Sequence, residues 1–203
     1  MLTLLIGLLV GLSYGFGISS ICKGEYQPSI YSRLVWLLIA TNSFIGVLAL
    51  SNSSGTLVLT GISVFGSLLM LLNALRYSVY VFGRTEIICT ILLVISVVLW
   101  VTVNAPLVNV ILGLGAHFIG GIPSIIKVIK KSTSENTLFW LFFALASMLA
   151  FIQSDRTQVD KYIFSLYHAI FDGAMTILAA RQYIKRLRFN GKTEVHEGEL
   201  IEP

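Results

Sequence analysis

Charged residues are scarce in this chain of 203 residues. Asp, Glu, Lys and Arg together make up 12% of it, about half of the roughly 25% that is usual in soluble domains. Long apolar runs recur along the whole chain instead, as membrane-spanning helices require. The composition therefore excludes a soluble globular domain and a disordered chain, and it predicts an all-α polytopic membrane protein.

Cysteine is also nearly absent. Cys22 and Cys89 have no metal-ligand spacing, and each lies beside a charged helix end, so we expect no metal site, no cofactor and no disulfide. The basic residues form no patch interleaved with aromatic side chains, which argues against nucleic acid as a partner. No Lys or Arg precedes the first apolar run, so we expect it to remain as a helix and not to be cleaved as a signal peptide.

Seven apolar segments are predicted to be transmembrane helices. They are residues 2–21, 34–50, 57–82, 87–103, 107–126, 138–152 and 162–180. Counts of six or eight spans are the alternatives. The sixth segment is short for a hydrocarbon core of about 30 Å, so we expect it to extend into Asn136 and Ser154 or to lie in a thinned region of the bilayer.

Lys and Arg are divided unequally between the two sides of these helices. With the N-terminus outside, the inner loops and the tail hold eleven of them, whereas the outer loops hold only Arg156 and Lys161. This asymmetry follows the positive-inside rule and requires an odd number of spans. The sequence predicts a multi-pass plasma-membrane protein with its N-terminus outside and its C-terminus in the cytoplasm.

An internal repeat relates the two halves of the chain. An offset of 104 residues aligns twelve identical residues within the 44 from Leu5 to Leu48, including Trp36 with Trp140. Three spans plus one connecting span make an even number, so both sets of three helices enter the membrane in the same direction. The predicted arrangement is 3+1+3, with two parallel three-helix bundles. The bundles are residues 1–84 and 106–188, joined by a lipid-facing linker helix at 85–105 and followed by a cytoplasmic tail at 189–203.

The second repeat resembles a known family. Residues 122–127 read Ile-Pro-Ser-Ile-Ile-Lys, and residues 130–137 read Lys-Lys-Ser-Thr-Ser-Glu-Asn-Thr before Trp140. This order of a helix-ending Pro, a basic run, a Lys-Ser loop with an acid and an aromatic helix start is similar to that of the PQ-loop and SWEET superfamily. The chain has Ser124 where that family has the Gln of its Pro-Gln pair. The resemblance implies a seven-helix transporter.

Few ionisable side chains lie inside the predicted helices, and each one needs an explanation because a charge in hydrocarbon is costly. Asp172 is the only acid within an apolar segment, and His168 lies four residues earlier on the same helix face. His117 lies at the centre of the fifth helix. We predict that all three contact the substrate and that Asp172 and His168 hold the coupling proton.

The third helix adds a polar stripe that contains Asn73, Arg76, Tyr77 and Tyr80. An offset of 99 residues aligns Asn73 with Asp172. In SWEET-like proteins the two third helices each present an Asn to the substrate, so the resemblance implies a substrate contact for Asn73. An acid at the other position can hold a proton, pair with Arg76 or bind a cationic substrate group.

Four further residues complete the predicted site. Tyr77, Asn42 and Ser147 are predicted to contact the substrate, and Pro123 is predicted as a hinge because proline removes a helix hydrogen bond and allows bending. Trp36, like its repeat partner Trp140, is interpreted as an anchor at the membrane–water interface.

These observations favour an alternating-access transporter of a small polar solute, such as a sugar or an amino acid, coupled to protons through Asp172. It is not expected to be an enzyme. Its partners would be the solute and the lipid bilayer, and a homo-oligomer stays open. The alternatives are a membrane receptor or scaffold on the same fold, an intramembrane zinc hydrolase that uses His117, His168 and Asp172, and a purely structural role for these three residues.

Overall fold

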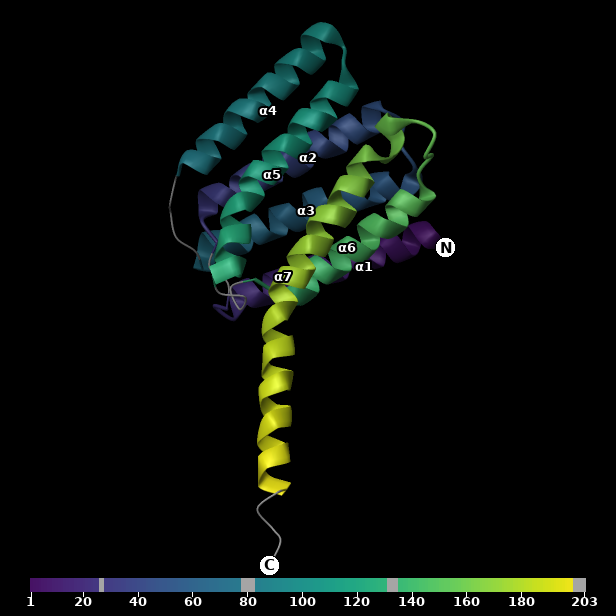
Figure 1. Ribbon diagram of the computed structural model, residues 1–203. Coiled ribbons are helices and arrows are strands. Elements are labelled where there is room, and N and C mark those ends of the chain that lie inside the picture. Colours follow the sequence, from purple (N-terminus) through teal and green to yellow (C-terminus); the bar gives the residue numbers. More distant parts are fainter. Residues whose placement is uncertain (26–27, 78–82, 131–134, 199–203) are drawn as a thin grey trace, which may run out of the picture.

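The computed structural model describes residues 1–25, 28–77, 83–130 and 135–198, with side chains described as far as Arg181. Within these ranges the chain is all-helical and has no β-strand (Figure 1). The described helices are α1 (Leu2–Cys22), α2 (Ile30–Ala49), α3 (Ser54–Tyr77), α4 (Arg84–Val103), α5 (Pro106–Lys130), α6 (Thr137–Gln153) and α7 (Val159–Gly198). All of these except α6 are long and apolar enough to cross a membrane.

The short helix α6 has polar caps at both ends. Asn136 precedes it, and its side-chain Oδ1 accepts hydrogen bonds from the backbone N–H groups of Leu138 and Phe139 at 2.9 and 3.2 Å. Ser154 is the residue that ends it. The expected extension into Asn136 and Ser154 is therefore a pair of caps, and the 17 helical residues span about 25 Å.

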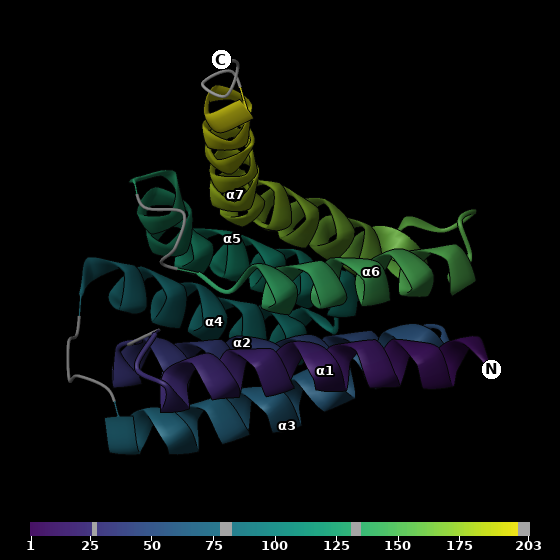
Figure 2. The same ribbon diagram turned by 90° about the horizontal axis from the view of Figure 1, so that it is seen from below.

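Several helices extend beyond the apolar runs that predicted them, among them α2 and α7. α2 begins at Ile30, so Arg33 lies within its first turns and not in a loop. α7 continues to Gly198, through residues that were predicted as tail, and its last part extends away from the other helices (Figures 1 and 2). Apolar runs miss these ends because a helix continues through charged residues wherever water can hydrate them.

The helices pack in a similar order in the two halves of the chain. α3 contacts both α1 and α2, and α7 contacts both α5 and α6. Between the halves, α1 packs on α6 and α2 packs on α5. In Figure 2, α1 and α3 lie on one side and α5 to α7 lie on the other.

The helix α4 lies at the edge of the assembly. It packs mainly on α5, and only Cys89, Leu93 and Ser96 are buried among its side chains. Many large apolar side chains of the other helices are exposed as well. Such extensive exposed apolar surface is not stable in water, which agrees with a helical membrane protein.

Glycines allow two aromatic rings to approach neighbouring helices closely. A Cβ atom on Gly66 would lie 2.2 Å from the Tyr14 ring, and one on Gly121 would lie 2.4 Å from the Phe171 ring. Since side chains cannot approach so closely, these two positions require glycine. The first contact joins α1 to α3, and the second joins α5 to α7.

Candidate functional site

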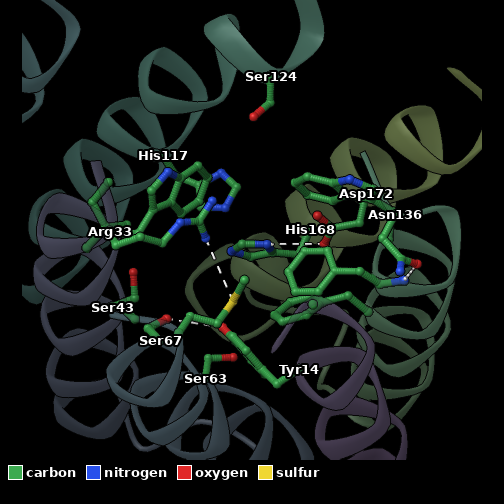
Figure 3. Close-up of a pocket in the computed structure, with 18 of the residues that line it drawn as sticks. Tyr14, Arg33, Ser43, Ser63, Ser67, His117, Ser124, Asn136, His168 and Asp172 are labelled. Carbon is green, nitrogen blue, oxygen red and sulfur yellow. Dashed lines mark hydrogen bonds and ion pairs between the residues drawn. The ribbon is translucent and has the colours of Figure 1, made fainter. Parts of the chain in front are cut away.

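A cavity of about 80 Å³ lies among the helices and reaches the end at which α2 and α6 begin (Figure 3). A single water needs about 10–15 Å³ on this scale, so the cavity has room for several waters or one small solute. Its described lining comes from α1, α2, α3, α5, α6 and α7 and from the residues just before α6. It therefore lies between the two halves of the chain.

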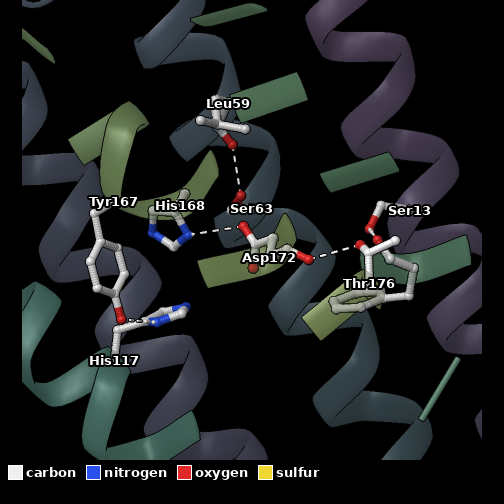
Figure 4. Close-up of polar contacts among 9 residues, drawn as sticks. Ser13, Leu59, Ser63, His117, Tyr167, His168, Asp172 and Thr176 are labelled. Atoms are coloured by element: carbon white, nitrogen blue, oxygen red, sulfur yellow. Dashed lines mark hydrogen bonds and ion pairs between the residues drawn. The ribbon is translucent and has the colours of Figure 1, made fainter. Parts of the chain in front are cut away.

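Asp172 and His168 form a buried pair in the wall of the cavity (Figure 4). Asp172 is only 2% exposed, and it lies thirteen residues after Val159, about 20 Å along α7. Its Oδ2 is 3.4 Å from His168 Nδ1, although neither atom has a hydrogen-bond partner among the described residues. The carboxyl group therefore has an ionisable neighbour and unused hydrogen-bonding capacity.

His117 joins this pair from α5. Its Nδ1 shares a hydrogen bond with the Tyr167 hydroxyl at 3.0 Å, and its ring centre lies 4.5 Å from that of His168. The Trp36 ring also packs against His117, with ring centres 4.6 Å apart. The structure thus brings together the three ionisable residues predicted for the site.

Trp36 and Trp140 both line the cavity. Trp140 is buried, and its Nε1 has no hydrogen-bond partner among the described residues. An interfacial anchor would instead face the lipid near the membrane surface. Trp36 on α2 and Trp140 on α6 face the cavity between the two halves of the chain.

Four residues predicted for the site lie outside the cavity lining. Asn73 donates to Leu69 O at 2.8 Å, and Tyr77 is exposed. Asn42 donates to Ser96 Oγ at 3.4 Å and so faces α4. Ser147 is buried, its Oγ has no hydrogen-bond partner within the described part of the chain, and its repeat equivalent Ser43 lines the cavity instead.

Arg76 does not pair with Asp172. Arg76 is exposed in the last turn of α3, and the described ion pair of Asp172 is with His168.

The predicted hinge Pro123 lies inside α5, which continues through it to Lys130. Tyr80 and the loop residues from Lys131 to Ser134 lie outside the described residues.

Sequence reasoning missed two charged residues of the lining, Arg33 and Glu135. Both lie at helix ends, where charge is common and draws no attention. Glu135 comes directly before the Asn136 cap, is 8% exposed, and has an Oε1 atom without a hydrogen-bond partner among the described residues. Burial raises the pKa of its carboxyl, and the positive charge of Arg33 and the Ser124 side chain offset part of this rise.

We expect Glu135→Gln to stabilise the unliganded protein at neutral pH. Since burial raises the folded-state pKa, the charged form costs stability above that pKa, and the cost disappears as pH falls below about 4, the usual range of an unfolded Glu. The thermal midpoint at pH 7.5 should rise by about 2–4 °C, and the difference from the wild type should vanish near pH 4. The exposed Glu25, replaced by Gln, is the control. A lower midpoint at pH 7.5 would mean that the carboxylate stabilises the fold.

No three His, Cys, Asp or Glu side chains form a metal-ligand group within the described part of the chain. His117 directs Nδ1 to Tyr167, and His168 faces Asp172. The three residues of the zinc-hydrolase alternative are thus close together but not arranged around one ion.

No protein-family model, no curated protein and no solved structure matches this chain. Its function is therefore inferred from the geometry of the cavity.

Proposed function

We propose that this protein is an alternating-access transporter of a small polar solute. The observation that carries the proposal is the cavity, which lies between the two halves of a helical membrane protein and contains a buried acid, two histidines and several hydroxyl groups. Ionisable groups at such depth usually belong to substrate or ion pathways, because burying them for structure alone is costly. A site between repeats is also the typical location in transporters.

The proposed architecture has two parallel three-helix bundles, residues 1–84 and 106–188, with α4 as the linker. The packing of α3 on α1 and α2 has its counterpart in the packing of α7 on α5 and α6. The repeat relates α1 to α5 and α2 to α6. It therefore converts the contact of α1 with α6 into the contact of α5 with α2, and both contacts are present. Together with the offset of 104 residues, this pattern supports the proposal that the chain is a PQ-loop or SWEET-like transporter.

Polar contacts close the end of the molecule at which α1 begins. Gln153 Nε2 donates to Thr3 Oγ1 at 3.0 Å and to Ser54 Oγ at 3.4 Å, so α6 is tied to α1 and α3. Thr56 Oγ1 lies 3.3 Å from Ser154 Oγ and 3.0 Å from Ser165 Oγ, so α3 is tied to α6 and α7. In the proposed cycle these bonds break when the two bundles rock and the cavity opens outward.

Proton coupling through Asp172 is the second part of the proposal. Asp172 faces His168, and His168 packs on His117, whose ring bonds to Tyr167. An imidazole ring can accept a proton at one nitrogen and release one from the other, so this series of groups offers a path for a proton to and from the carboxyl. Neutralising the carboxyl would make it less costly to move the two bundles around the site.

Counterflow into proteoliposomes tests the proposed transport. Liposomes that contain the full chain are loaded with a mixture of unlabelled amino acids and sugars and diluted into labelled L-serine or D-glucose. A transporter should accumulate at least one label transiently above the level of protein-free liposomes. Neither label exchanging, across a range of pH, would contradict the proposal for these two solute classes.

The orientation is proposed from the distribution of basic residues. With Cys22 and Cys89 replaced by Ser, a cysteine at the exposed Asp155 should react with an impermeant maleimide added to intact cells, because the α6–α7 connection would face outward. A cysteine at the exposed Lys130 should react only after the cells are opened. The reverse pattern would contradict an outer N-terminus, a cytoplasmic C-terminus and a location in the plasma membrane with this orientation.

Pro123 is proposed as the point at which α5 bends during the cycle. It lies in the helix interior, where it removes a backbone hydrogen bond, and Gly121 lies two residues earlier against Phe171. Pro123→Ala should slow exchange by about tenfold and leave solute affinity within about twofold, because it removes a pliable point and no ligand group. Unchanged exchange rates, measured beside Pro106→Ala at the start of the same helix, would assign Pro123 to folding alone.

A further inference from the structure

A buried polar cluster joins α4 to both halves of the chain. Ser96 of α4 donates to the backbone O of Asn109 on α5 at 3.0 Å and also to the side-chain Oδ1 of Asn109. The same Ser96 Oγ accepts a hydrogen bond from Nδ2 of Asn42 on α2 at 3.4 Å. All three residues are buried, Ser96 and Asn109 completely. One hydroxyl group of α4 therefore bonds to residues of both proposed bundles.

The cluster lies in the half of the molecule nearest the end at which α1 begins. Asn42 and Ser96 each lie seven residues before the last residue of their helices, about 10 Å, and Asn109 is the fourth residue of α5. The cavity reaches the opposite end. The bonds of Gln153 tie α6 to α1 and α3 at the end where α1 begins, and the cluster ties α2 to α5 in the same half.

Two glycines allow α2 and α5 to approach closely around the cluster. A Cβ atom on Gly46 would lie 2.8 Å from Asn109 Nδ2. A Cβ atom on Gly113 would lie 3.1 Å from Asn42 Nδ2 and 3.7 Å from Ser43 Oγ. Because Ser43 lines the cavity, the cluster lies directly beside it. A motion that opens the cavity toward the end where α1 begins must separate α2 from α5 at this contact.

The cluster contains one bond that stabilises this closed contact and one unused donor that destabilises it. The bond is the one from Asn42 Nδ2 to Ser96 Oγ. The unused donor is Nδ2 of Asn109, which has no hydrogen-bond partner among the described residues. A buried donor without a partner raises the free energy of the state that contains it. If α2 and α5 separate, water can hydrate this donor and can replace the broken bond.

Contacts of α4 indicate which bond would break. α4 packs mainly on α5 and less on α2. Besides the two bonds from Ser96 to Asn109, Cys89 of α4 donates to Ala116 O of α5 at 3.3 Å. The bond to Asn42 is the longest of the three that Ser96 makes. Separation of the bundles would therefore leave α4 on α5 and break the bond to Asn42.

We propose that α4 moves with the second bundle and that the hydrogen bond from Asn42 to Ser96 is a latch, which holds the outer end of the cavity closed. The inference rests on the proposed alternating access and names the residues that set its equilibrium. In this account α4 takes part in the motion and is more than a connection between the bundles. The unused donor of Asn109 limits the stability of the closed state, so the latch can open.

Distances between spin labels test the latch without any solute. In the full chain without its two native cysteines, labelled cysteines replace the exposed Ala49 and Val103, the last residues of α2 and α4. Pulsed electron paramagnetic resonance in a phosphatidylcholine bilayer measures their separation. A second pair, at the exposed Val98 of α4 and Ile111 of α5, reports whether these two helices move together. We expect two separations for the first pair and one for the second.

Two variants should shift this equilibrium in opposite directions. Asn42→Leu removes the latch and should raise the ratio of the longer to the shorter separation about threefold, as is typical for one hydrogen bond between membrane helices. Asn109→Leu removes the unused donor and should lower the ratio about threefold or more. The side-chain bond that it also removes joins α4 to α5, which move together, so its loss favours neither state.

The matched control is Thr41→Val. Thr41 precedes Asn42 on α2, but its hydroxyl donates to Leu37 O of the same helix at 2.9 Å. Its loss should leave the ratio of the two separations unchanged. Ser96→Ala tests the latch if a leucine variant does not fold, because it removes a single oxygen. It should raise the ratio as Asn42→Leu does, and the two changes together should add nothing further, since both remove the same bond between the bundles.

Three results would overturn the latch. In the first, the leucine variants lower the thermal midpoint but leave the ratio unchanged, so the cluster only stabilises the fold. In the second, the separation of the Val98 and Ile111 labels changes with that of the first pair, so α4 does not move with α5. In the third, the wild type shows counterflow but a single separation for the first pair, which leaves a transporter without this latch. Two separations that respond as expected, without counterflow of any solute, would contradict transport and leave the latch standing.

Discussion

Replacing Asp172 with Asn should abolish the acceleration of solute uptake by an inward proton gradient. The side chain is almost completely buried and its ionisable neighbour is His168, so it is well placed to hold the transported proton. Asparagine has nearly the same shape but cannot take up a proton at this site. A gradient of one pH unit can accelerate coupled uptake by up to about tenfold, and we expect the Asn variant to lose all of this while exchange at equal pH continues.

The control for Asp172→Asn is Asp155→Asn. Asp155 is an exposed acid in the connection between α6 and α7, where it accepts hydrogen bonds from Thr157. The Asp155 variant should keep the full response to the gradient. A gradient response that survives in the Asp172 variant would make Asp172 structural, and a wild type that ignores the gradient would be a uniporter or no transporter.

Replacing Ser63 with Trp should reduce counterflow to the level of protein-free liposomes. Ser63 lines the cavity from α3, and its Oγ donates to Leu59 O of the same helix at 2.7 Å (Figure 4). An indole ring on this side chain would extend from α3 into the cavity and obstruct it. A solute could then no longer enter, whatever its identity.

The control for Ser63→Trp lies two residues along the same helix. Phe65 is 72% exposed and faces away from the cavity, so Phe65→Trp adds a similar ring on the outer surface. It should leave counterflow within about twofold of the wild type, as is usual for exposed substitutions. Full transport by a folded Ser63→Trp variant would place the solute pathway elsewhere.

The sequence predicted the residues that are most costly to place inside a membrane. Asp172, His168 and His117 stand out because ionisable groups are rare in long apolar runs, and the structure brings all three to one cavity. The helical fold was predictable for the same reason, since spans of about 20 apolar residues have few alternatives in lipid. Composition and spacing are sufficient for both.

Residues at helix ends were not predictable in this way. Arg33 and Glu135 were counted as ordinary loop charges, and only the packing of α2 and α6 reveals that both reach the cavity. The predicted equivalence of Asn73 and Asp172 was based on alignment alone. An alignment does not determine side-chain direction, and Asn73 bonds to its own helix while Asp172 faces the cavity.

Accessibility of one cysteine from both sides of the membrane tests alternating access most directly. Ser43 is buried on α2 and lines the cavity, so a single cysteine there, with Cys22 and Cys89 replaced by Ser, reports on the site without any substrate. Right-side-out and inside-out vesicles are each treated with a small impermeant thiol reagent. The account predicts slow but complete labelling from either side, in vesicles that stay impermeable to the reagent. Labelling from one side only, over the time in which counterflow occurs, would contradict it.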